Sequence, residues 1–148
     1  MTERQELINN LIDIWQEKNV TRCLPSEGKS MYPLIKQGDN ILINFVPFKN
    51  IKVGDIAAFR RNNLTIVHRL IKKMPAGFVE KGDFQIKGFF VKNNAVLGKV
   101  PLQPRAVARF LSFFGYLLYK LGPMAKPFLV IPFMVNAGTR IYLKLRQD

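Results

Sequence analysis

The chain has 148 residues, a formal net charge of +13 and 48% hydrophobic residues. This length suits one domain that buries a core, and the hydrophobic share excludes a disordered tail. The single cysteine, Cys23, excludes an internal disulfide, and the single histidine argues against a zinc site of the Cys/His type, so we expect no metal and no cofactor.

The first 20 residues predict an amphipathic helix. Charged residues interrupt this segment, so it lacks the continuous apolar stretch of a cleaved export signal. Apolar side chains recur at helical spacing and form one face of this helix, which must pack on the rest of the protein. These residues are Leu7, Ile8, Leu11, Ile12 and Trp15.

From residue 38 to about residue 100 the sequence predicts a small β domain. Short β-branched and aromatic runs alternate with Gly, Asn and Lys, as is typical of strands joined by turns. His68 falls on one of these runs. The expected strands cover residues 41–46, 55–60, 64–71, 77–80, 85–91 and 95–100.

The last third is apolar, aromatic and basic. Its apolar runs, residues 110–119 and 128–135, are each shorter than the roughly 20 residues that span a bilayer. They suit an interfacial helix or a shallow re-entrant hairpin on anionic lipid, or else a pair of amphipathic helices that closes the core of the β domain. We therefore divide the chain into a β domain with its N-terminal helix, residues 1–104, and a helical segment, residues 105–148. The basic residues around the apolar runs are Arg105, Arg109, Lys120, Lys126, Arg140, Lys144 and Arg146.

Three residues could carry the chemistry of a serine hydrolase. Ser30 lies on a turn punctuated by Gly28 and Pro33, and a serine becomes a nucleophile where a base takes its proton. His68 is the only histidine, and imidazole exchanges protons near neutral pH, as a general base must. Asp83 could orient that imidazole. Each also has a structural interpretation: a surface or capping serine, a buried histidine and a turn aspartate.

Four motifs occur in order within residues 25–100. They are Ser30-Met31-Tyr32-Pro33-Leu34 with Gly38-Asp39, then Gly54-Asp55-Ile56, Val67-His68-Arg69 and Lys81-Gly82-Asp83. Together they resemble the successive boxes of the signal peptidase I and S24/S26 serine peptidase superfamily. The resemblance implies a mainly β (α+β) fold, a small, partly open β-barrel of the S24/S26 peptidase type. To this barrel the sequence adds an N-terminal helix and C-terminal apolar helices.

The resemblance also implies roles for the candidate residues. Ser30 corresponds to the nucleophile, and His68 stands where bacterial leader peptidases and self-cleaving repressors have a lysine base. The chain is thus similar to the archaeal, sporulation-associated and endoplasmic-reticulum branch. Asp83 matches the aspartate of the Lys-Gly-Asp box, but residues 84–100 lack the second aspartate that this branch often has. Either Asp83 or no acid completes the triad.

The residues around the nucleophile are expected to bind the substrate. Backbone N–H groups near Ser30 or Met31 would hold the oxyanion, and the side chains of Met31 and Pro33 would contact the bound peptide.

General signal peptidases resemble one another in an N-terminal membrane anchor, whereas this chain begins with a charged helix. We therefore expect a serine endopeptidase that cleaves a dedicated leader or precursor peptide and binds an anionic membrane surface, on the cytoplasmic face of the inner membrane. The alternative is a catalytically inactive peptidase-fold module that binds a precursor peptide or the membrane. We expect no nucleic-acid partner, because no nucleic-acid-binding motif accompanies the positive charge.

Overall fold

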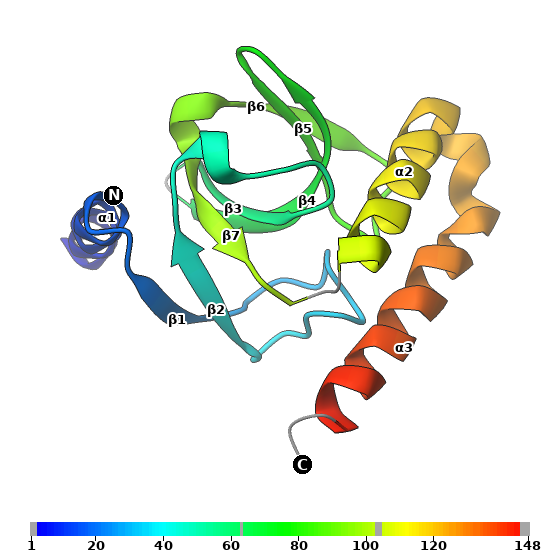
Figure 1. Cartoon of the computed structure of the whole chain (residues 1–148), viewed down its shortest axis with the longest axis horizontal. Coiled ribbons are helices and arrows are strands. Elements are labelled where there is room, and N and C mark those ends of the chain that lie inside the picture. Colours follow the sequence, from blue (N-terminus) through cyan, green and yellow to red (C-terminus); the bar gives the residue numbers. More distant parts are fainter. Residues whose placement is uncertain (1–2, 63, 103–104, 146–148) are drawn as a thin grey trace.

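The computed structural model describes residues 3–62, 64–102 and 105–145. Seven antiparallel strands form one curled sheet in the order β1-β2-β7-β3-β4-β5-β6, and the sheet is not closed (Figure 1). This architecture confirms the expected mainly β fold. The strands are β1 (Thr21–Pro25), β2 (Asn40–Phe45), β3 (Ile56–Arg61), β4 (Leu64–Met74), β5 (Gly77–Lys81), β6 (Gly88–Lys92) and β7 (Val96–Val100).

Helices lie at two opposite sides of the sheet. Helix α1 (Glu3–Glu17) lies beside β1 and β2, and α2 (Arg105–Leu121) and α3 (Val130–Leu145) lie on the other side, joined by the 3₁₀ segment η3 (Gly122–Leu129) (Figure 1). Two further 3₁₀ turns, η1 (Phe48–Asn50) and η2 (Asn93–Ala95), join strands. The expected helices at both ends of the chain are thus present.

Strand β3 separates two hydrophobic clusters, because side chains of a strand alternate between its faces. Ile56 and Ala58 point into the first cluster, which also holds Met31 from the turn after β1. Ala57 and Phe59 point into the second cluster. Core packing on both faces therefore fixes the central strands, and it fixes the turn that follows Ser30.

Helix α1 uses only part of its expected apolar face for packing. Ile12 is buried and Trp15 is half-buried against the ring of Phe45, whereas Leu7 and Leu11 are exposed. The side chain of Ile8 lies outside the described part of the chain. Helix α1 therefore covers the edge of the sheet with a narrow strip of side chains.

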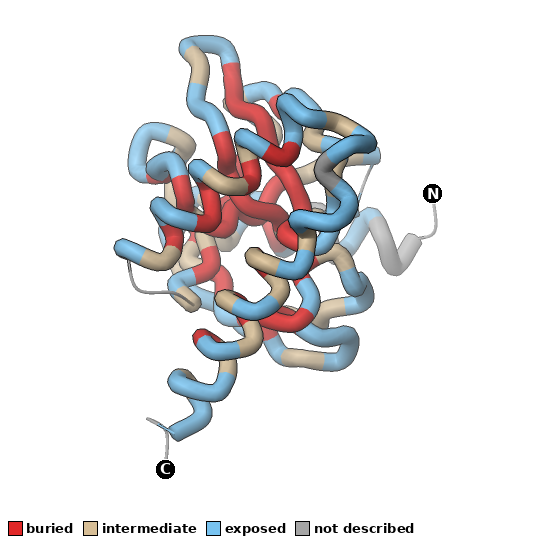
Figure 2. Tube along the Cα trace, turned by 90° about the vertical axis from the view of Figure 1, so that its right-hand side faces the viewer, coloured by how far each residue is buried: buried red, intermediate tan, exposed pale blue. Residues whose placement is uncertain are grey.

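Helix α2 packs directly on β4. The Ser112 hydroxyl donates a hydrogen bond of 3.0 Å to the Leu70 carbonyl, and Leu111 and Leu118 are buried on the same helix face. The opposite faces of α2 and α3 remain exposed, as Figure 2 shows from this side of the molecule. The helices thus close one side of the β domain and leave an apolar outer surface.

Candidate active site

Ser30 lies on a turn between β1 and β2 that is anchored on both sides. Met31 and Ile35 are buried in the core, and the Ile35 N–H donates to the Met31 carbonyl at 3.0 Å. The Ser30 carbonyl accepts a hydrogen bond of 3.0 Å from the Phe84 N–H. The side chain of Ser30 is half-buried, so the hydroxyl is held in place yet remains accessible.

His68 lies on β4, opposite Ala57 of β3. Its Nε2 atom is 2.7 Å from Oγ of Ser30, although 38 residues separate the two along the chain. The imidazole and the ring of Phe59 meet edge to face, with ring centroids 6.2 Å apart. The structure therefore brings the expected nucleophile and the expected base within hydrogen-bond distance.

Glu80, which is not among the residues expected from the sequence, occupies the other side of the imidazole. Its Oε2 is 2.5 Å from Nδ1 of His68, and its Oε1 accepts a hydrogen bond of 2.6 Å from Arg61. The side chain of Glu80 is fully buried on β5. Arg61 is held in turn by the faces of Phe59 and Phe89. Glu80 thus lies where an acid can orient the ring and balance its positive charge.

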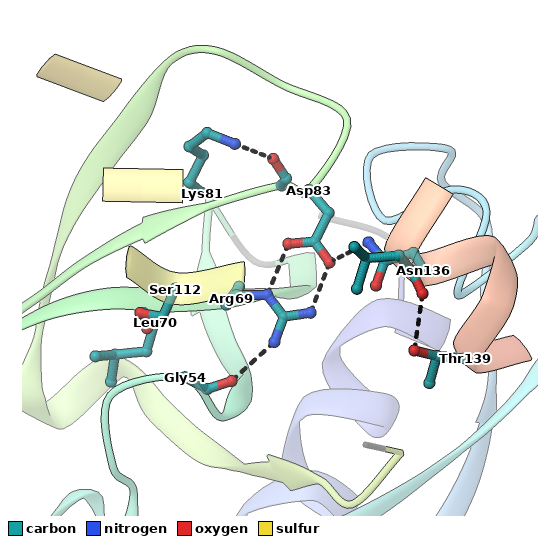
Figure 3. Close-up of polar contacts among 10 residues, drawn as sticks. Gly54, Arg69, Leu70, Lys81, Asp83, Ser112, Asn136 and Thr139 are labelled. Atoms are coloured by element: carbon teal, nitrogen blue, oxygen red, sulfur yellow. Dashed lines mark hydrogen bonds and ion pairs between the residues drawn. The ribbon is translucent and has the colours of Figure 1, made fainter. Parts of the chain in front are cut away.

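Asp83 does not take the position expected for the triad acid. Its carboxylate accepts two hydrogen bonds from Arg69, of 2.7 and 2.6 Å, and one of 2.8 Å from Asn136 (Figure 3). Burial alone would raise the pKa of Asp83, but the Arg69 guanidinium outweighs it and holds that pKa below its ordinary value. Asp83 is therefore the ionised centre of a buried network beside the site, and Glu80 contacts His68 in its place.

The sequence contains one signal for Glu80. A glutamate within a run of strand-forming residues needs a hydrogen-bond or charged partner if the strand is buried, because a buried charge must be paired. All five positions of β5 are buried. The burial of every side chain of β5 requires other elements to cover both faces of the sheet, which is a tertiary property. In the sequence, Glu80 and Lys81 instead look like the polar end of a strand before the turn at Gly82.

An apolar cleft of about 510 Å³ opens beside Ser30 and His68. Of the two residues expected to bind substrate, Met31 is buried but belongs to the lining of the cleft, whereas Pro33 is buried within the turn and does not line the cleft. Other lining residues come from α1 (Leu11, Ile12 and Trp15), from the segment Leu24 to Gly28, from β2 (Ile41 and Ile43) and from β4 (Leu64 to Val67).

The cleft follows a strand edge that has no partner in the described sheet. Strand β5 pairs with β4 only from Arg69 to Met74, and residues 64–68 are paired only on the β3 side. Residues 64–67 of that unpaired stretch line the cleft next to the catalytic candidates. The backbone N–H and C=O groups on this side of residues 64–68 have no strand partner in the described sheet.

A serine, a histidine and a carboxylate in series form the arrangement that serine peptidases use, here on a small open sheet. The family model described as Peptidase S24-like matches residues 3–80, more than half of the chain. The chain therefore belongs to the Peptidase S24-like family. The match includes Ser30, His68 and Glu80 and ends before Asp83. No curated protein and no solved structure matches the chain.

Proposed function

We propose that this chain is a serine endopeptidase of the signal-peptidase type, in which Ser30 is the nucleophile, His68 the general base and Glu80 the acid that orients it. The observation that carries the proposal is the continuous chain of short contacts from Ser30 Oγ through the imidazole to the Glu80 carboxylate. Histidine at the base position favours the Ser/His branch of the superfamily.

The contacts suggest how each group would act. Ser30 Oγ attacks the scissile carbonyl and gives its proton to Nε2 of His68. Nδ1–H donates to Glu80, which stabilises the imidazolium until Nε2 passes the proton to the leaving amine. A water molecule, deprotonated by the same imidazole, then hydrolyses the acyl-enzyme. Backbone N–H groups near Ser30 and Met31 are the candidates for binding the oxyanion.

The substrate that fits this site is a peptide segment in extended conformation. The unpaired edge of β4 can add a strand, and backbone hydrogen bonds would hold that strand regardless of its sequence. The walls of the cleft are mostly aliphatic and aromatic, so apolar or small side chains would enter it. A leader or precursor peptide has this character.

The proposed second partner is an anionic membrane surface. The outer faces of α2, η3 and α3 expose apolar side chains, and exposed cations flank them. Apolar groups surrounded by lysine and arginine favour the interface of a negatively charged bilayer. The apolar residues are Phe110, Phe113, Leu117, Met124, Phe128, Val130, Met134, Ile141 and Leu145, and the described cations are Arg109, Lys120, Lys126 and Lys144. The side chain of Arg105 and the whole of Arg146 lie outside the described part.

By length and composition alone, one described segment, Lys126–Leu145, could cross a membrane, with a mean hydropathy of 1.2. Its inner face, however, bonds to the β domain through Asn136 and Arg140. Crossing a bilayer would require these polar contacts to be broken. We therefore propose that α3 lies on the membrane, at its cytoplasmic face, with its outer stripe of side chains in the interface.

Cleavage of a peptide library in the presence of anionic vesicles, followed by mass spectrometry, tests the catalytic assignment. We expect cleavage by the wild type and by Cys23→Ala, a control because Cys23 is exposed on β1 and does not line the cleft. Ser30→Ala should abolish cleavage and leave the melting temperature nearly unchanged, and His68→Ala should abolish cleavage as well. A fluorophosphonate should label Ser30 alone. Cleavage that persists in Ser30→Ala would overturn the proposal, and a wild type that binds peptide or vesicles without cleavage or labelling would identify a binding module.

A further inference from the structure

We infer that α3 is a positioning element of the active site, which holds the turn that carries Ser30 and the strand that carries His68 in their relative places. This inference rests on the proposed function. Two polar side chains of α3, Asn136 and Arg140, make the contacts. They are four residues apart and so lie on the same face of the helix.

Asn136 connects α3 to the strand of the base. Its side chain is fully buried, and its Nδ2 donates a hydrogen bond of 2.8 Å to Oδ2 of Asp83. Asp83 in turn binds the guanidinium of Arg69, which directly follows His68 on β4 and also donates to the Gly54 carbonyl at 2.8 Å (Figure 3). A chain of buried hydrogen bonds thus joins α3 to the backbone next to the imidazole.

Arg140 connects the same helix to the turn of the nucleophile. Its guanidinium donates to the Leu34 carbonyl at 2.9 Å and to both carboxylate oxygens of Asp39, at 2.6 and 3.0 Å. Leu34 and Asp39 lie in the segment that begins at Ser30. The hydrogen bond from Arg140 lowers the pKa of Asp39 below its ordinary value, so this pair is charged at neutral pH.

A third contact lies between these two. The ring of Phe133 on α3 faces Tyr32, with centroids 5.9 Å apart, and Phe84, with centroids 6.4 Å apart. Tyr32 is two residues from Ser30, and the N–H of Phe84 bonds to the Ser30 carbonyl. One face of α3 therefore contacts the surroundings of the nucleophile and, through Asp83, those of the base.

These contacts predict a kinetic effect of a particular kind. The cleft is lined by residues of α1, β1, β2 and β4 and by the segment around Ser30, which includes Met31 and Ile35, and none of the lining residues belongs to α3. Loosening α3 should therefore remove no side chain from the cleft and should mainly disturb the 2.7 Å contact between Ser30 and His68. Small displacements of reacting groups reduce the rate of the chemical step strongly.

The test compares Asn136→Ala and Arg140→Ala with Thr139→Ala, whose hydroxyl donates a hydrogen bond of 2.9 Å to the Val135 carbonyl within the same helix. With a peptide that the wild type cleaves, we expect kcat to fall by roughly 10- to 100-fold in the first two variants, with KM within about twofold of wild type. The rate of fluorophosphonate labelling at Ser30 should fall in parallel. Thr139→Ala should match the wild type in all three quantities.

Arg140→Lys and Asn136→Ser keep the inference testable if the alanine variants do not fold. Lysine retains the charge but lacks the planar fork with which Arg140 bonds both Asp39 oxygens, so kcat should lie between wild type and Arg140→Ala. Unchanged kcat in folded variants, a rise in KM alone, or an equal loss in Thr139→Ala would overturn the inference. A wild type without Ser30-dependent cleavage or labelling would instead overturn the proposed function.

Discussion

The carboxylate of Glu80 lies 2.5 Å from Nδ1 of His68, whose Nε2 is 2.7 Å from the hydroxyl of Ser30. Both ring nitrogens thus have one partner each, and the imidazole has a defined orientation. Because Glu80 is buried and also bonded to Arg61, its position is fixed from two sides. This geometry supports the orienting role proposed for Glu80, whereas Asp83 bonds to Arg69 and Asn136.

Glu80→Gln is expected to lower kcat on the order of 10⁴-fold, the loss found where the acid of a serine peptidase triad becomes an amide. The amide keeps the shape of the side chain but removes the charge that stabilises the imidazolium. Steady-state cleavage assays, with the melting temperature of each variant as a folding control, measure this effect. Asp83→Asn is the matched variant and should lose far less kcat; an equal or larger loss in Asp83→Asn would contradict the assignment.

Asp83→Ala is expected to destabilise the fold by about 3–5 kcal/mol, because it leaves the guanidinium of Arg69 buried without its carboxylate. Urea unfolding at neutral pH measures this difference. Protonation of the same carboxylate should also destabilise the wild type in acid. The pKa of Asp83 is below its ordinary value of 3.8, so the stabilisation is complete above pH 3.8 and is lost as the pH falls through the folded pKa. Equal acid sensitivity of wild type and Asp83→Ala below pH 3.8 would argue against this.

Gly82→Ala is expected to displace the nucleophile. A Cβ atom at this position would lie 2.8 Å from the Ser30 carbonyl oxygen, a backbone atom that cannot rotate away. The turn of Ser30 or the strand of Glu80 must then shift, and kcat should fall while the cleft retains its peptide affinity. Gly138→Ala is the control, because a Cβ there meets no atom within 4 Å. Normal kcat in Gly82→Ala would mean that the site tolerates this shift.

Most strands could be predicted from the sequence because they are rich in β-branched and aromatic residues. Strand β1 could not. Four of the five residues of Thr21–Pro25 are exposed, so the strand carries no apolar pattern and is formed by its pairing with β2. The run at 85–91 was placed too early, since β6 begins only at Gly88. Gln85 instead closes a turn by donating its N–H to the Gly82 carbonyl.

For the site, residue type and order singled out Ser30 and His68, whose side chains the fold brings together. The sequence did not predict which carboxylate contacts the imidazole. Glu80 and Asp83 are three residues apart, and only the register of β5 determines which of them faces His68. Asn136 could not be selected either. Its partner is known only once α3 is docked on the β domain.

Removing the apolar outer surface should weaken membrane binding. Phe113→Ser and Met134→Ser each remove a large exposed side chain, and loss of a fully inserted side chain of this size is worth about 1.5–3 kcal/mol. Lys126→Glu should lower the partition coefficient further on anionic lipid, since one surface cation contributes about 1 kcal/mol. Co-sedimentation with phosphatidylcholine vesicles, with and without phosphatidylserine, measures both terms. Leu7→Ser, at the exposed face of α1, is the control and should bind like wild type.

Because of Lys81, the free energy of unfolding is expected to increase with pH in mildly alkaline solution. Burial lowers the pKa of its ammonium from 10.5 to about 8, although Asp83 and Glu80 act in the opposite direction. Between pH 8 and 10.5 the unfolded chain therefore binds a proton that the folded chain has released, and the free energy of unfolding increases with pH by up to about 3 kcal/mol. Urea unfolding of wild type and Lys81→Met from pH 7 to pH 10.5 isolates this effect from other titrating groups. The wild type should gain stability relative to Lys81→Met across this interval, whereas parallel curves would show that the folded protein keeps the lysine protonated.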